Sequence, residues 1–99
     1  EVDDVESAVS VLKGLSYVNP DRIGVMGWSH GGYITTLLLT REAQGSPFKA
    51  GVAMVPVTNL FFRLSYKGPS YQRSFSTQAA VRGLPFEKRE EYVRRSPYY

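Results

Sequence analysis

The chain has no cysteine and only one histidine, His30. The missing thiols exclude a disulfide scaffold, a zinc–thiolate site and a cysteine nucleophile. A single imidazole excludes a histidine-rich metal site within this chain, so we expect neither a metal nor another cofactor. The absence of cysteine is compatible with a cytoplasmic location, which the sequence otherwise leaves unknown.

Long apolar runs are also absent. No uncharged stretch reaches the roughly 18 residues that a membrane span needs, so we expect no transmembrane segment and no membrane partner. The first four residues, Glu1 to Asp4, show no signal peptide, although a sequence that does not begin with Met says little on this point. The length of 99 residues predicts one domain at most, and a composition of 42% hydrophobic and 21% charged residues is typical of a globular one.

Charge is unevenly distributed along the chain. Residues 1–59 have a net charge of −2 and residues 60–99 one of +5, within a total of +3. A basic half is one feature of nucleic-acid-binding proteins. Here the cations are dispersed, with Glu87, Glu90 and Glu91 among the last of them. The pattern therefore favours a solvated basic surface and no nucleic-acid partner.

Hydrophobic periodicity predicts helix, strand, helix and strand in the first part of the chain. Valines at helical spacing indicate a helix from Val2 to about Gly14. Arg22–Trp28 and Ala50–Val55 have the length of strands and are apolar on both faces, as buried parallel strands are. Tyr33–Arg41 is apolar nearly all round and predicts a buried helix between them. This order is typical of α/β architecture with parallel strands and right-handed crossovers.

Periodicity weakens after Pro56. Residues 58–64 predict one or two helical turns, and residues 65–83, rich in Ser, Gly, Gln and aromatics, predict a long loop. A short polar helix is expected from Glu87 to about Arg95.

One motif points to chemistry. Residues 27–32 read Gly-Trp-Ser-His-Gly-Gly and contain G-x-S-x-G between a predicted strand and a predicted helix. This is the setting of a nucleophile elbow, a strained turn that exposes Ser29 at a helix N-terminus and directs the next N–H, that of His30, at an oxyanion. Side chains at Gly27 or Gly31 are expected to collide with neighbouring backbone. The alternative interpretation is a purely structural Gly-Ser-Gly turn.

Several segments together resemble the prolyl oligopeptidase family of serine peptidases, most closely its dipeptidyl-peptidase and acylaminoacyl-peptidase branches. They are Asn19–Ile23, Met26–Tyr33, Phe48–Ala53 and Pro56–Thr58, with further likeness at Arg82–Pro85 and Arg95–Pro97. The resemblance implies a partial α/β-hydrolase fold, with residues 1–99 a fragment of one catalytic domain. It also implies that Ser29 is the catalytic nucleophile and that the backbone N–H of His30 lines the oxyanion hole.

The chain departs from that family where the rest of a catalytic triad is concerned. In α/β-hydrolases the acid and then the histidine follow the serine, but no Asp follows Ser29 and no other His follows His30. Neighbouring side chains on such a turn diverge, so we do not expect His30 to act as the base. Asp3, Asp4 and Asp21 precede the serine and read as helix-start and turn residues. The triad Asp and His are therefore expected outside this chain, as are the first strands, any β-propeller and the tyrosine that completes the family's oxyanion hole.

Aromatic residues near the motif have two interpretations. Trp28 and Tyr33 are more typical of core packing than of substrate contact. The resemblance implies that the stretch after the second strand lines the pocket for the residue before the scissile bond, which names Val57, Leu60 and Tyr71 as substrate-binding. Core packing under a loop is the alternative for this stretch.

Three functions remain open on the sequence. The first is a serine peptidase that cleaves peptide bonds through an acyl-enzyme, and the second an esterase or lipase of the same fold. The third is an inactive fragment that acts only as an interaction module. For the first two functions, the expected partner is a peptide or acyl substrate. The isolated chain is expected to be inactive, and to associate through unpaired sheet edges or to depend on missing flanks.

Overall fold

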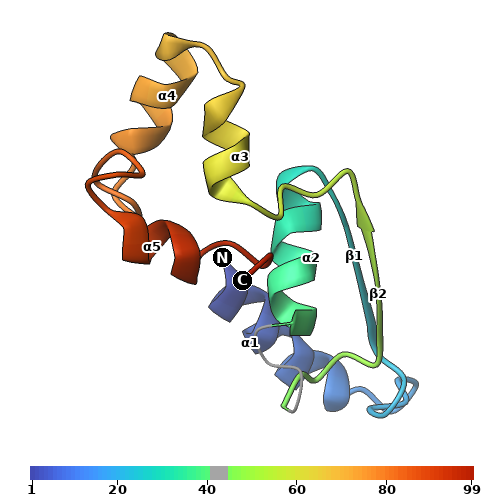
Figure 1. The fold of residues 1–99 in the computed structure, drawn as a ribbon. Coiled ribbons are helices and arrows are strands. Elements are labelled where there is room, and N and C mark those ends of the chain that lie inside the picture. The colour runs from blue at the N-terminus through green and yellow to red at the C-terminus, as the bar shows by residue number, and fades with distance from the viewer. Residues whose placement is uncertain (41–44) are drawn as a thin grey trace. The chain divides into compact units, whose positions relative to one another are not determined.

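The computed structural model describes residues 1–40 and 45–99, which form two compact units, residues 1–56 and residues 57–99. The first unit contains a helix, a strand, a second helix and a second strand, in the predicted order (Figure 1). They are α1 (Val2–Lys13), β1 (Gly24–Trp28), α2 (His30–Thr40) and β2 (Ala50–Met54). The second unit contains α3 (Leu60–Ser65), α4 (Pro69–Ser76) and α5 (Arg89–Arg94). That both units belong to one catalytic domain stays a prediction.

The two strands pair in parallel, from Gly24 opposite Ala50 to Trp28 opposite Met54. Helix α2 connects them and packs on both, and α1 contacts α2 (Figure 1). The predicted α/β class with parallel strands and an incomplete sheet is therefore confirmed. Both strands are shorter than predicted, and α2 begins at His30 rather than Tyr33. The predicted helix end at Arg41 lies outside the described residues.

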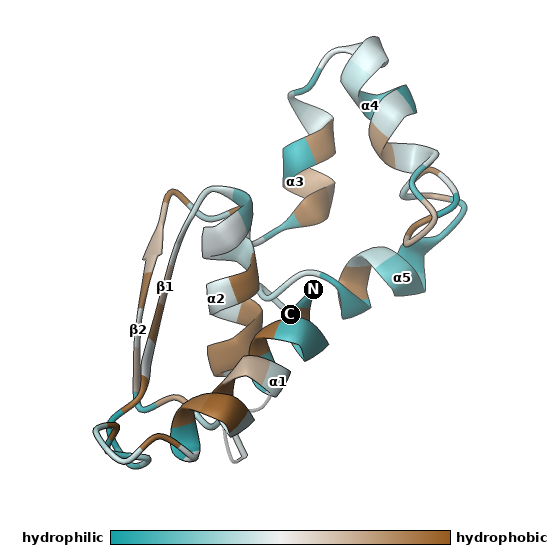
Figure 2. Cartoon of the chain, turned by 180° about the vertical axis from the view of Figure 1, so that it is seen from behind, coloured by the Kyte–Doolittle hydropathy of each residue, from teal (hydrophilic) through white to brown (hydrophobic). Residues whose placement is uncertain are grey.

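The core of the first unit is apolar and is formed by α1, α2 and residues in or just before the two strands. Val2 and Val5 pack from α1 against four buried residues, and Figure 2 shows apolar residues along α2 and β2. The buried residues are Val9, Ile23, Leu38 and Phe48.

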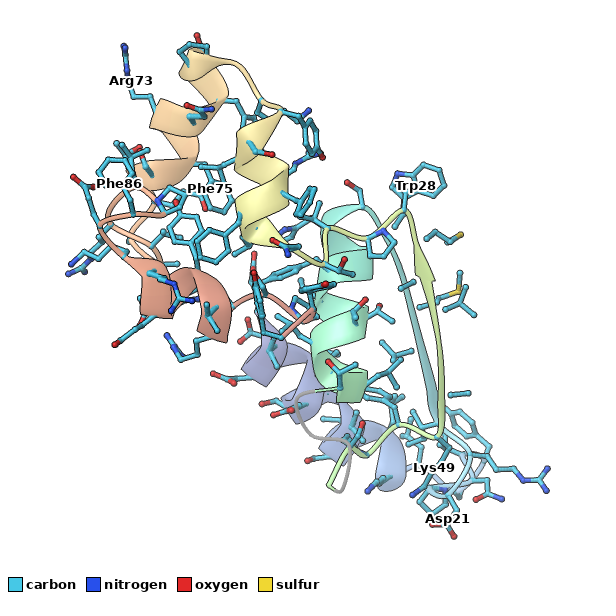
Figure 3. All side chains as sticks on the ribbon, in the orientation of Figure 1. Asp21, Trp28, Lys49, Arg73, Phe75 and Phe86 are labelled. Atoms are coloured by element: carbon cyan, nitrogen blue, oxygen red, sulfur yellow. The ribbon has the colours of Figure 1, made fainter. Side chains whose placement is uncertain are left out.

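The prediction that both faces of the strands are buried is wrong for this chain. Met26, Trp28 and Val52 are 68%, 66% and 57% exposed. Figure 3 shows Trp28 projecting from the end of β1, so the expectation that Trp28 is a core residue is also wrong. The reason is that α2 covers one face of the sheet, and among the described residues no helix of the first unit packs on the other.

The second unit has its own core, formed by Leu60, Leu64, Val81 and Tyr92. Phe75 of α4 packs against it, with its ring 6.2 Å from that of Tyr92, and Figure 3 shows this side chain directed away from solvent-facing Arg73. No helix in the described part of the chain is long and apolar enough to cross a membrane.

The prediction of a loop over residues 65–83 is wrong where α4 forms. Gly68 caps this helix and Pro69 occupies its first turn, where proline's fixed φ favours helix formation and its missing N–H costs nothing. The Gln72 amide donates to the carbonyl oxygens of Leu64 and Lys67, both at 2.9 Å, and so ties α4 to the end of α3. The Gly-Pro pair was the available sequence signal for this helix.

Candidate active site

Ser29 lies at the junction of β1 and α2, in a conformation that residues other than glycine rarely adopt. Its φ is 53°, and a non-glycine residue pays about 1–3 kcal/mol for such backbone. The surrounding backbone holds it there. The Ser29 N–H donates to the Met54 carbonyl at the end of β2, and the Tyr33 N–H donates to the Ser29 carbonyl, both at 2.9 Å. The turn is therefore fastened to the neighbouring strand and to the first turn of α2.

Glycines let the backbone of α2 approach both strands at this turn. A Cβ atom on Gly27 would lie 2.2 Å from the Gly31 carbonyl oxygen, and one on Gly32 would lie 2.8 Å from the Met54 carbonyl oxygen. Both distances are below what real Cβ atoms show. A Cβ on Gly31 would meet nothing within 4 Å in the described chain, so the expected collision at Gly31 is wrong. Gly31 instead supplies the backbone that excludes a side chain at Gly27.

The N-terminus of α2 follows Ser29 directly, because His30 is the first residue of the helix. The first N–H groups of an α-helix have no acceptor within the helix, and its dipole places partial positive charge there. The half-buried Ser29 is thus next to a region that stabilises negative charge. No described side chain forms a hydrogen bond to its hydroxyl group.

The imidazole of His30 points to a partner other than Ser29. Its Nε2 lies 3.1 Å from the Glu1 Oε2, and its ring centroid is 5.7 Å from that of Tyr33. The His30 side chain is 66% exposed, so it is not packed into the core. Sequence reasoning did not identify the Glu1 partner, because no local pattern joins residues so far apart in the chain.

The earlier aspartates take the places expected of them. Asp3 and Asp4 lie in the first turn of α1, and the Asp21 N–H donates to the Asn19 side chain in the following turn. Among the described residues, no three His, Asp or Glu side chains are grouped to hold a metal ion.

The three residues expected to bind substrate lie in the second unit and have different surroundings. Leu60 is 5% exposed and belongs to the core, against which the half-buried Val57 packs. Tyr71 is 37% exposed, and its hydroxyl oxygen accepts a hydrogen bond from the Arg63 Nε at 3.2 Å. Their role in substrate binding stays a prediction. The Arg63 contact was missed at the sequence level, where Arg63 counted only among dispersed cations.

Parallel strands joined through α2, with a strained serine at the strand–helix junction, define the class of this protein as α/β with a candidate nucleophile turn. The statistical sequence model of the prolyl oligopeptidase family matches residues 1–99, so the chain belongs to that family. The resemblance seen in the sequence is thereby confirmed, as is the assignment of the fold to part of an α/β-hydrolase.

Relatives with curated names extend this result. The chain is 40% identical over 62 residues to dipeptidyl aminopeptidase B of Saccharomyces cerevisiae, and the matched segment covers 63% of the chain and 8% of the relative. It is 34% identical over 80 residues to a probable dipeptidyl-aminopeptidase B of Pyrenophora tritici-repentis, covering 81% and 9%. It is 38% identical over 58 residues to dipeptidyl peptidase 4 of Bos taurus, covering 59% and 7%. The matched segments therefore span less than a tenth of these relatives.

Proposed function

We propose that residues 1–99 carry the nucleophile of a serine peptidase that cleaves peptide bonds. The observation that carries this proposal is the φ of 53° at Ser29, at the end of a parallel strand and directly before a helix. Val55 and Arg82 also have a positive φ, but among the described residues only Ser29 combines it with a place directly between a strand and a helix. Strained non-glycine residues cluster at active sites. In a nucleophile elbow this conformation exposes the serine hydroxyl group, which a merely structural turn does not require.

In the proposed reaction, the Ser29 Oγ attacks the carbonyl carbon of the scissile bond. The hydroxyl proton passes to a histidine outside this chain, which an aspartate orients, and the carbonyl oxygen becomes an oxyanion. The backbone N–H of His30 donates to that oxyanion. The C–N bond then breaks, the amine leaves with the proton, and water hydrolyses the acyl-enzyme.

The peptide substrate is supported by the family and by relatives named dipeptidyl peptidases. By analogy with those names, we propose that the enzyme releases dipeptides. Val57 and Tyr71 contribute to the substrate pocket, and Leu60 supports its wall from the core. The His30 side chain takes no part as base, because it forms no hydrogen bond with the Ser29 hydroxyl group and its Nε2 contacts Glu1 instead.

The test uses the full-length protein that contains these residues. Ser29→Ala should lower kcat for a dipeptidyl p-nitroanilide by at least about 10⁴-fold, since removal of a triad serine leaves only binding and oxyanion stabilisation. Ser10→Ala, on the exposed side of α1, is the matched control and should retain wild-type turnover. Turnover by Ser29→Ala at the wild-type rate would refute the proposal. Hydrolysis of p-nitrophenyl esters without peptide cleavage would instead assign an esterase.

A further inference from the structure

Two cations and two tyrosines form a cluster in the second unit, consisting of Arg63, Tyr66, Lys67 and Tyr71 (the Arg63 cluster). The Arg63 Nη1 donates to the Tyr66 hydroxyl at 2.9 Å, and its Nε donates to the Tyr71 hydroxyl at 3.2 Å. The guanidinium carbon lies 5.8 Å and 5.3 Å from the two ring centroids. The Lys67 ammonium lies 5.6 Å and 5.3 Å from the same rings. Both cations therefore converge on one pair of aromatic rings.

The positive charge of the Arg63 cluster has no carboxylate to balance it. No Asp or Glu occurs anywhere between Glu42 and Glu87 in the sequence. The ion pairs of the described residues engage neither Arg63 nor Lys67. Two like charges beside one another repel unless an anion or an aromatic face compensates them. Among the described residues, the positive charges of Arg63 and Lys67 are therefore compensated only by the two tyrosine rings.

Most of the hydrogen-bonding capacity that remains available in the cluster is for donation. Arg and Lys side chains have no acceptor atom. The oxygen atoms of Tyr66 and Tyr71 accept from Arg63, which leaves both O–H groups free to donate outward, and these hydrogen bonds raise the pKa of Arg63 above its ordinary value. Tyr66 is 63% exposed and Tyr71 37%, so a ligand from solvent can reach both hydroxyl groups. A cluster of donors with net positive charge fits an anionic acceptor.

We propose that the Arg63 cluster binds the carboxylate of an acidic side chain in the peptide substrate. That the ligand is part of a peptide rests on the proposed function, whereas its negative charge is inferred from the cluster alone. Tyr71 belongs to the cluster and is also one of the residues proposed above to contribute to the substrate pocket, so the carboxylate is assigned to the peptide. Arg63 supplies the planar donor pair and Lys67 a second charge.

The experiment compares pairs of peptides that differ only in Glu against Gln, with that position moved along the peptide. At one position the full-length enzyme should prefer Glu by about tenfold in kcat/KM, the size expected for one charge-assisted hydrogen bond. The preference should fall to about one in Arg63→Met and should weaken in Tyr71→Phe, which keeps the ring. Arg73→Met removes an exposed cation of the same unit that is outside the cluster, and should keep the preference.

A binding measurement separates this inference from the proposed function. Calorimetry with the Ser29→Ala protein should give tighter binding of the Glu peptide than of the Gln peptide, and Arg63→Met added to it should remove the difference. Equal binding and equal kcat/KM for both peptides at every position would overturn the inference and leave the peptidase proposal intact. Binding of free glutarate that depends on Arg63, without discrimination between the peptides, would also overturn the substrate assignment. Absence of peptide cleavage with the binding difference preserved would instead refute the proposed function alone.

Discussion

A methyl group on Gly27 should disrupt the turn that carries Ser29. Its carbon would lie 2.2 Å from the oxygen and 2.3 Å from the carbon of the Gly31 carbonyl group, and both are backbone atoms. No side-chain rotation relieves such a contact, so the start of α2 must move by roughly 1 Å from β1. Overpacking of this kind lowers the free energy of unfolding by about 1–3 kcal/mol or more. We expect about 3 kcal/mol for Gly27→Ala, because the new methyl group belongs to a paired strand and meets helix backbone, and neither can shift easily.

Gly31→Ala provides the matched control within the same turn. A Cβ there meets nothing within 4 Å, and alanine favours a helix over glycine by about 1 kcal/mol. Gly31→Ala should therefore leave the free energy of unfolding unchanged or raise it slightly. The assay is urea unfolding of the full-length protein followed through the catalytic domain, with Gly27→Ala, Gly31→Ala and wild type in parallel. Equal midpoints for Gly27→Ala and wild type would refute the close approach of α2 to β1.

Three further predictions concern packing, pH and the isolated chain. Ser96→Ala should lower the free energy of unfolding by about 1–3 kcal/mol, because the buried Ser96 hydroxyl accepts from the Leu60 N–H and donates to the Tyr92 carbonyl. A loss below about 0.5 kcal/mol in a urea titration would contradict this prediction. Burial raises the pKa of Tyr92, so the neutral phenol stabilises the fold below about pH 10, and this stability should be lost as the pH rises through the folded-state pKa. Tyr92→Phe should remove that alkaline dependence in pH-dependent unfolding, and an unchanged profile would exclude Tyr92 as its source. The isolated 99-residue chain should hydrolyse p-nitrophenyl acetate and a Pro-p-nitroanilide only at the background rate. It should also associate through the sheet face on which Trp28 is exposed, so Trp28→Lys should lower its sedimentation coefficient. An active monomer would contradict both expectations.

The order of elements in the first unit was predictable because its signals are local. Valines at helical spacing, apolar runs of strand length and the glycines around Ser29 each specify structure within a few residues. Burial was not predictable in the same way. Met26 and Trp28 read as core residues because parallel strands are normally covered on both faces, whereas the described part of this chain covers only one.

The errors at the turn and in the second unit have a similar cause. Gly31 and Gly27 look equivalent in the G-x-S-x-G pattern, and only the three-dimensional path of α2 shows which of them faces backbone. Helix α4 was missed because its residues are mostly polar and its stabilising contacts, from Gln72 and Phe75, lie with α3 and α5. The Arg63 cluster depends on such contacts as well, so composition alone could not reveal it.

Covalent labelling of Ser29 tests the central claim most directly. A fluorophosphonate reacts only with a serine whose hydroxyl group is activated, and mass spectrometry then locates the adduct on the chain. With the full-length protein, we predict a single adduct at Ser29 and none in the Ser29→Ala variant. An adduct on another serine, or equal labelling of Ser29→Ala, would contradict the assignment of Ser29 as the nucleophile.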